Sequence, residues 1–113
     1  MPTYDDLRAI ARTIPNVEES TSYGTPALKL KKKLVARLRE DGHTVAMFSA
    51  EQDIEMLPKI SPETFSVPQH YVGYGMLVID LQRIRKEELV GLFQEAVKQV
   101  SKKLAATKKR RGR

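Results

Sequence analysis

The side chains of this chain that could carry out chemistry are few. The sequence has two histidines, His43 and His70, and no cysteine. The histidines lack the HExxH or HxH spacing that brings two imidazoles onto one zinc ion. Ser20 and Ser22 are conceivable nucleophiles, but neither lies in a nucleophile elbow, and no glycine-rich phosphate loop is present. We therefore expect a protein that is not an enzyme and that holds no metal or cofactor.

Positively charged side chains gather between positions 29 and 39, where there are six of them and no acid. Residues alternating along two neighbouring strands share one face, and cations on such a face can neutralise phosphates and release counterions. The alternative is that the wet face of a sheet only needs polar residues, and that edge lysines discourage aggregation. The candidate nucleic-acid contacts here are Lys29, Lys31, Lys32, Lys33, Arg37 and Arg39.

A second basic cluster closes the chain. Residues 102–113 carry +7 and residues 1–101 carry −1 of the overall +6, so the basic pI near 9.7 comes mostly from the last dozen residues. Phosphate contacts from such a tail carry no base information. The alternative is a solvated tail without a function. The candidate contacts are Lys108, Lys109, Arg110, Arg111 and Arg113.

Aromatic and polar residues also lie in two loops that each precede a strand. Since both loops end where a strand begins, we expect that they can meet at one end of the sheet, where the rings would stack on a base or hold a small ligand. The alternative is that the tyrosines close the edge of the core, which the neighbouring Gly73 and Gly75 favour. The candidate residues are Tyr23 and Thr25 in the first loop and His70, Tyr71 and Tyr74 in the second.

The elements that must position these residues follow from the spacing of the apolar residues. A first helix is capped by Thr3 with Asp6 and is ended by Pro15. Segment 16–26 is rich in turn residues and is predicted to be a loop. The Asp41-Gly42 pair is a strong hairpin signal. Three antiparallel strands are predicted at 27–31, 34–39 and 44–49.

Alternation in the second strand predicts that Leu34, Ala36 and Leu38 face the core, opposite Val35, Arg37 and Arg39. The second half of the chain is predicted to hold a short helix stopped by Pro58, a capped turn, a short strand, a loop, an apolar strand and a long final helix. Their ranges are 50–57, 61–64, 65–67, 68–75, 76–81 and 86–106.

The order of these elements is α-β-β-β-α-β(β)-α, which favours an α+β fold with an antiparallel sheet and helices packed mainly on one face. A chain of 113 residues suits one core. We expect a single domain over residues 1–106 and a disordered basic tail over residues 107–113.

Four short motifs in this order resemble the MmcQ/YjbR family, over about residues 3–104. They are Ser22-Tyr23-Gly24-Thr25-Pro26-Ala27, Ala36-Arg37-Leu38, Pro62-Glu63-Thr64-Phe65 and His70-Tyr71-Val72-Gly73-Tyr74. The resemblance implies a topology like that of secretion chaperones and double-wing domains, DNA binding, and a bacterial, cytosolic protein. It names no catalytic residue. The sequence departs from the family at Gly75-Met76, where members often have Pro-Trp, and Met76 is expected to fill that space.

The absence of cysteine and of an apolar stretch near the N-terminus leads us to expect a cytoplasmic protein with no membrane partner. The favoured function is DNA binding through the basic hairpin and the tail. Two alternatives stay open. One is an interaction module with chaperone-like topology, which includes a homodimer and leaves the protein partner unspecified. The other is small-ligand binding at the Tyr/His loop.

Overall fold

The computed structural model describes residues 2–111, with side chains up to residue 106. The described residues form three helices, one 3₁₀ turn and six strands. Their bounds are α1 Tyr4–Ala11, β1 Val17–Ser22, β2 Thr25–Leu30, β3 Lys33–Leu38, β4 Thr44–Phe48, α2 Glu51–Ile60, β5 Phe65–Ser66, η1 Gln69–Tyr71, β6 Met76–Asp80 and α3 Lys86–Arg111.

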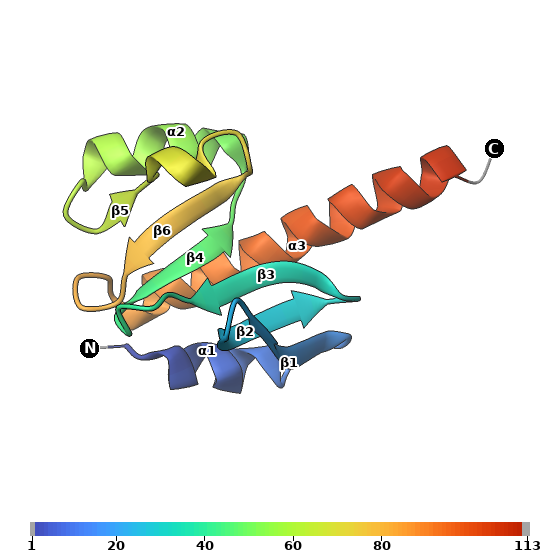
Figure 1. The fold of residues 1–113 in the computed structure, drawn as a ribbon, viewed down its shortest axis with the longest axis horizontal. Coiled ribbons are helices and arrows are strands. Elements are labelled where there is room, and N and C mark those ends of the chain that lie inside the picture. The colour runs from blue at the N-terminus through green and yellow to red at the C-terminus, as the bar shows by residue number, and fades with distance from the viewer. Residues whose placement is uncertain (1, 112–113) are drawn as a thin grey trace.

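The strands form one antiparallel sheet in the order β1-β2-β3-β4-β6-β5. Helices α1 and α3 lie against one face of this sheet, and α2 lies beyond its β6–β5 end (Figure 1). Leu7 of α1 and Phe93 of α3 are fully buried in the main core, together with Leu28, Met47 and Ile79 from the strands. This arrangement confirms the predicted α+β class with helices mainly on one face.

Strand β1 was predicted as part of a loop, and that prediction is wrong. The strand lies at the edge of the sheet and pairs only with β2, with Glu18 opposite Lys29. Four successive residues, 18–21, are exposed, so the strand has no alternation of apolar and polar residues by which it can be recognised. A two-residue turn follows, with Tyr23 at φ 54° and Gly24 at φ 80°, which is typical of a tight hairpin.

The predicted faces of the second strand are wrong at its start. A bulge lies between the pairs Leu28–Ala36 and Lys29–Leu34, so Val35 is an extra residue. The extra residue turns Val35 into the main core and leaves Leu34 on the opposite face. From Ala36 onward the predicted alternation is found.

Two helices run further than predicted. Pro58 does not end α2, since it lies in the last turn and the Ser61 N–H still bonds the Leu57 carbonyl at 2.9 Å. Helix α3 continues from the expected end near Ala106 to Arg111. Four of the five added residues are Lys or Arg, which have favourable helix propensity and are favoured at the C-terminal end of a helix. Residues 112–113 of the predicted tail lie outside the described residues. The other elements differ from their predicted bounds by a few residues.

Candidate functional site

Aromatic and cationic side chains gather around one hollow of about 590 Å³, which we call the Arg37 hollow. It opens on the sheet face turned away from α1 and α3, because Arg37 and Arg39 alternate with core residues of β3. The lining residues are Tyr23, Leu34, Arg37, Arg39, Glu40, His70, Tyr71, Tyr74 and Met76.

Three parts of the chain build this hollow. The β1–β2 turn presents Tyr23, and β3 with the residues after it supplies the two arginines. The third part is the loop before β6, where the Tyr71 N–H bonds the Pro68 carbonyl at 2.9 Å and the Tyr74 N–H bonds the Tyr71 carbonyl at 3.0 Å. Gly75 lets this loop lie against the sheet, because a Cβ there would be 3.0 Å from the Phe48 ring and its φ is +74°.

Arg37 is the centre of the hollow and is only 4% exposed. Its Nη1 donates to the Tyr71 hydroxyl at 3.1 Å, and its Nη2 donates to Glu40 Oε2 at 2.6 Å. Its guanidinium carbon lies 5.3 Å from the centre of the Tyr23 ring, within cation–π range. The Glu40 backbone N–H lowers the pKa of the Glu40 carboxyl, and the charge and hydrogen bond of Arg37 lower it further.

Arg39 adds a second guanidinium at the same hollow. It lies 5.9 Å from the Tyr71 ring centre, and the Tyr71 ring stands 4.3 Å from that of His70 at 39°. The Nε atoms of Arg37 and Arg39 are buried without a hydrogen-bond partner in the part of the chain that the structure describes. Around them, Tyr23 is 86% exposed and Tyr74 is 72% exposed. The arrangement therefore combines fixed cations with open aromatic faces.

The structure brings together residues from two separate predicted sites. Tyr23, His70, Tyr71 and Tyr74, expected in a ligand loop, line the same hollow as Arg37 and Arg39 of the basic hairpin. Thr25 is not among the lining residues. Its hydroxyl donates to the Ser22 carbonyl at 3.0 Å and so closes the hairpin turn.

Arg37 does not stand on an exposed basic face, as the strand alternation predicted. The face is partly covered, since Tyr71 and Leu34 pack beside buried Ala46, Met76 and Val78 in a second small apolar cluster. The position that alternation placed in water is therefore buried, and Glu40 neutralises its charge.

The lysines of the basic hairpin lie outside the hollow lining. Lys31 and Lys32 are exposed and form the β2–β3 turn, both with left-handed backbone at φ 49° and 72°. Lys29 and Lys33 flank this turn and are half-buried. Lys108, Lys109, Arg110 and Arg111 lie on α3, whose side chains are described only up to residue 106, and Arg113 lies outside the described residues.

Sequence reasoning missed Leu34, Glu40 and Met76 as members of this site. Met76 was assigned a space-filling role, and it is buried in the small cluster. The signal for Glu40 was its place three residues after Arg37 at the start of the hairpin loop. Only the tertiary placement of Tyr71 makes that pair part of a site.

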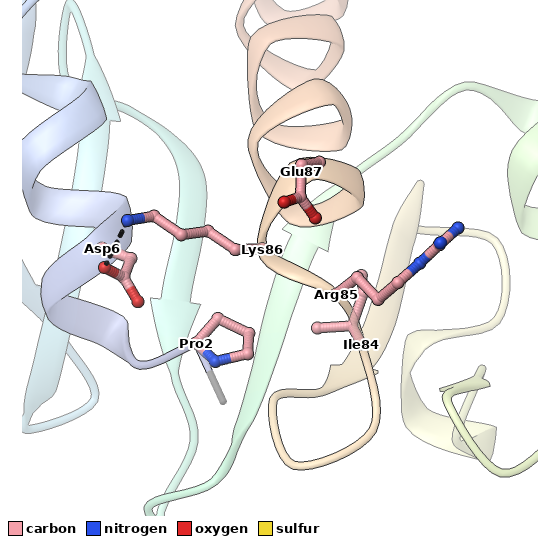
Figure 2. A pocket seen from close by; sticks show the side chains of 6 residues that line it. All are labelled: Pro2, Asp6, Ile84, Arg85, Lys86 and Glu87. Atoms are coloured by element: carbon pink, nitrogen blue, oxygen red, sulfur yellow. Dashed lines mark ion pairs between the residues drawn. The ribbon is translucent and has the colours of Figure 1, made fainter.

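A second hollow of about 500 Å³ lies where α1 and α3 begin (Figure 2). Lys86 reaches across it to Asp6 at 3.5 Å, while Arg85 extends away. The Thr3 backbone N–H, which donates to Asp6 at 2.8 Å, is the main cause of the lowered pKa of Asp6, and the Lys86 charge lowers it further. Asp6 and Lys86 therefore tie α1 to α3, which is a structural role.

The described residues contain no group of three or more His, Asp or Glu side chains placed to hold a metal ion. None of the helices over this part of the chain combines the length and the apolar character that crossing a bilayer requires.

The fold of this chain is similar to that of a solved structure, and at the identity found the likeness concerns the fold alone. No family model and no curated protein sequence matches this chain. Its structure is similar to the crystal structure of Deinococcus radiodurans protein DR2400, which carries the family-model domain DUF419, with a TM-score of 0.77 and 21% identity. The match covers 91% of this chain and 81% of that one.

Proposed function

We propose that this protein binds single-stranded nucleic acid at the Arg37 hollow and at the lysine turn, Lys31 and Lys32, which lies at the other end of the β2–β3 hairpin. The observation that carries the proposal is the placement of two exposed tyrosines, Tyr23 and Tyr74, around two guanidinium groups in one hollow. Stacking faces combined with cations are the two elements that single-strand binding proteins use. Every base has a stacking face, so this arrangement suits a strand of any sequence.

The lysine turn supplies the phosphate contacts in this proposal. Lys31 and Lys32 are exposed at the end of the β2–β3 hairpin, and Lys29 and Lys33 follow on either side. Two adjacent non-glycine residues with left-handed backbone are costly, and such strain concentrates at functional sites. The turn thus keeps two cations together at the expense of local stability.

The nucleic-acid proposal also draws on the resemblance of four sequence motifs to the MmcQ/YjbR family, and the fold is consistent with that resemblance. DUF419, the domain of DR2400, is the family of MmcQ/YjbR-like proteins, so the structural likeness agrees with the motifs of this sequence. Membership of that family, and the DNA binding associated with it, are part of the proposal.

The test is fluorescence anisotropy with a labelled single-stranded 12-mer and the corresponding duplex. We expect the single strand to bind more tightly than the duplex. The double variant Tyr23→Ala/Tyr74→Ala is expected to weaken single-strand binding by about 10-fold or more, since stacking contributes about 1–3 kcal/mol per base. Ile60→Ala, which removes an exposed apolar side chain of α2, is the matched control and leaves affinity unchanged. Equal affinity for strand and duplex, with no effect of the tyrosine variants, would refute the proposal.

A further inference from the structure

Arg37 has an unusual environment for a buried cation. Its side chain is 5% exposed, whereas the carboxylate that neutralises it, Glu40, is 67% exposed. A buried charge needs a partner of opposite charge, because desolvation of an isolated ion is costly. Here that partner is a surface side chain that can turn into water.

The two ends of this pair differ in how firmly they are held. Arg37 lies near the end of β3, where it is paired on both sides, with Ala46 of β4 and with Ala27 of β2. The Tyr71 hydroxyl and the Tyr23 ring hold its guanidinium from two further sides. Glu40 follows β3 in the hairpin loop, where its carboxylate is held by Arg37 and by its own backbone N–H. The cation is therefore fixed and the carboxylate is replaceable.

The hollow has room for more than a carboxylate. Its volume of about 590 Å³ falls within the range of about 300–1,000 Å³ that is typical of small-molecule sites. Arg37 Nε and Arg39 Nε both lack a hydrogen-bond partner in the described part of the chain. Each of the two guanidinium groups thus has an unused donor, which favours an anion with several oxygens, and planar guanidinium groups match phosphate geometry.

We propose that Glu40 is a resident counter-ion that the terminal phosphate of a nucleotide displaces from Arg37. The phosphate oxygens then accept hydrogen bonds from Arg37 and Arg39, and the base lies against the Tyr23 or Tyr74 ring. This inference rests on the proposed function, since it uses the same tyrosines, and it names the ligand group that the hollow takes. A phosphate monoester of this kind occurs on a free mononucleotide and on the phosphorylated end of a strand.

The experiment is calorimetric titration of the full chain with a nucleoside 5′-monophosphate, with the matching nucleoside, and with one single-stranded oligonucleotide with and without a 5′-phosphate. We expect the phosphate to be required or to tighten binding by at least 10-fold. Glu40→Gln is expected to bind the phosphorylated ligand about two- to fivefold more tightly, because the phosphate no longer has to displace a charged carboxylate, and the Glu40 end of the pair stands in water, where ion pairs are weak. The matched control is Glu55→Gln, which removes a carboxylate that is 69% exposed and paired with Lys59 outside the hollow, and it leaves affinity unchanged.

The outcomes separate the sources of the phosphate and the two proposals. Binding of the mononucleotide, or of the phosphorylated strand alone, supports the inference and identifies the source. If phosphorylated and unphosphorylated ligands bind equally, or Glu40→Gln binds like the wild type, the inference is overturned, although strand binding stands. If the mononucleotide binds and strands do not, the inference stands and the proposed function falls. Arg37→Lys is expected to weaken phosphate binding by at least 10-fold. If the Arg37→Lys protein does not fold, the Glu40→Gln measurement still tests the inference.

Discussion

Arg37 and Glu40 are joined at 2.6 Å, yet one side chain is buried under the loop before β6 and the other stands in water. This asymmetry distinguishes the pair from the surface ion pairs of the molecule, such as Lys59 with Glu55, whose two side chains are both exposed. Burial of an arginine has a desolvation penalty that an exposed counter-ion offsets only in part, so this pair adds little to stability. A site that binds anions, in contrast, needs such a cation.

A buried hydroxyl in α1 gives a first prediction. The Tyr4 hydroxyl has no hydrogen-bond partner among the described residues, whereas the Tyr71 hydroxyl accepts a bond from Arg37. Tyr4→Phe is expected to raise the free energy of unfolding by up to about 1 kcal/mol, and Tyr71→Phe to lower it by about 1–2 kcal/mol. Urea denaturation measures both. Equal effects of the two variants would contradict the assignment of partners.

The same residue makes stability sensitive to alkaline pH. Burial raises the pKa of Tyr4 to about 12, against the lowering effect of Arg8. The folded-state pKa of Tyr4 lies above the unfolded value of 10.0. The contribution of the neutral Tyr4 side chain to the free energy of unfolding is therefore fully present below pH 10 and is lost as pH rises towards 12. The wild type is therefore expected to lose about 2–3 kcal/mol more than Tyr4→Phe over this interval. Parallel pH profiles of the two proteins would refute this prediction.

The lysine turn is expected to trade stability for charge. Lys32 has φ 72°, where glycine has no steric penalty. Lys32→Gly is expected to raise the free energy of unfolding by about 1 kcal/mol and to weaken oligonucleotide binding. Lys32→Gln removes the same charge and keeps the unfavourable backbone, so it should weaken binding without the gain in stability. Thermal unfolding measures the stability of the two variants, and anisotropy measures their binding. A gain in stability in both variants would exclude backbone strain at Lys32 as its cause.

The basic end of the chain is expected to contribute salt-dependent affinity. Replacement of Lys108, Lys109, Arg110, Arg111 and Arg113 by glutamine removes five positive charges. If all five meet phosphates of a single strand, the slope of log affinity against log salt should fall in magnitude by about 3.5, since each phosphate contributes about 0.7. Anisotropy at several salt concentrations measures the slope. An unchanged slope would remove the tail from the proposed binding surface.

Much of the fold could be predicted from local patterns. The alternation of Leu28 and Leu30 and the Asp41-Gly42 turn locate strands and a hairpin, because a half-buried strand must alternate and a tight turn needs a positive φ. The edge strand β1 could not be predicted in this way, since its exposed residues carry no alternating signal. The bulge at Val35 was equally invisible, because a one-residue shift leaves the composition unchanged.

The sequence by itself determined most of the elements, the antiparallel α+β class and most of the residues worth attention, because these depend on neighbours within a few positions along the chain. Tertiary structure decided which of those residues meet. It placed Tyr23 from one hairpin and Tyr71 from a loop nearly fifty residues later in contact with Arg37. It also turned Arg37 from an expected surface cation into a buried one, since burial depends on what covers a sheet face, and the covering loop is distant in sequence.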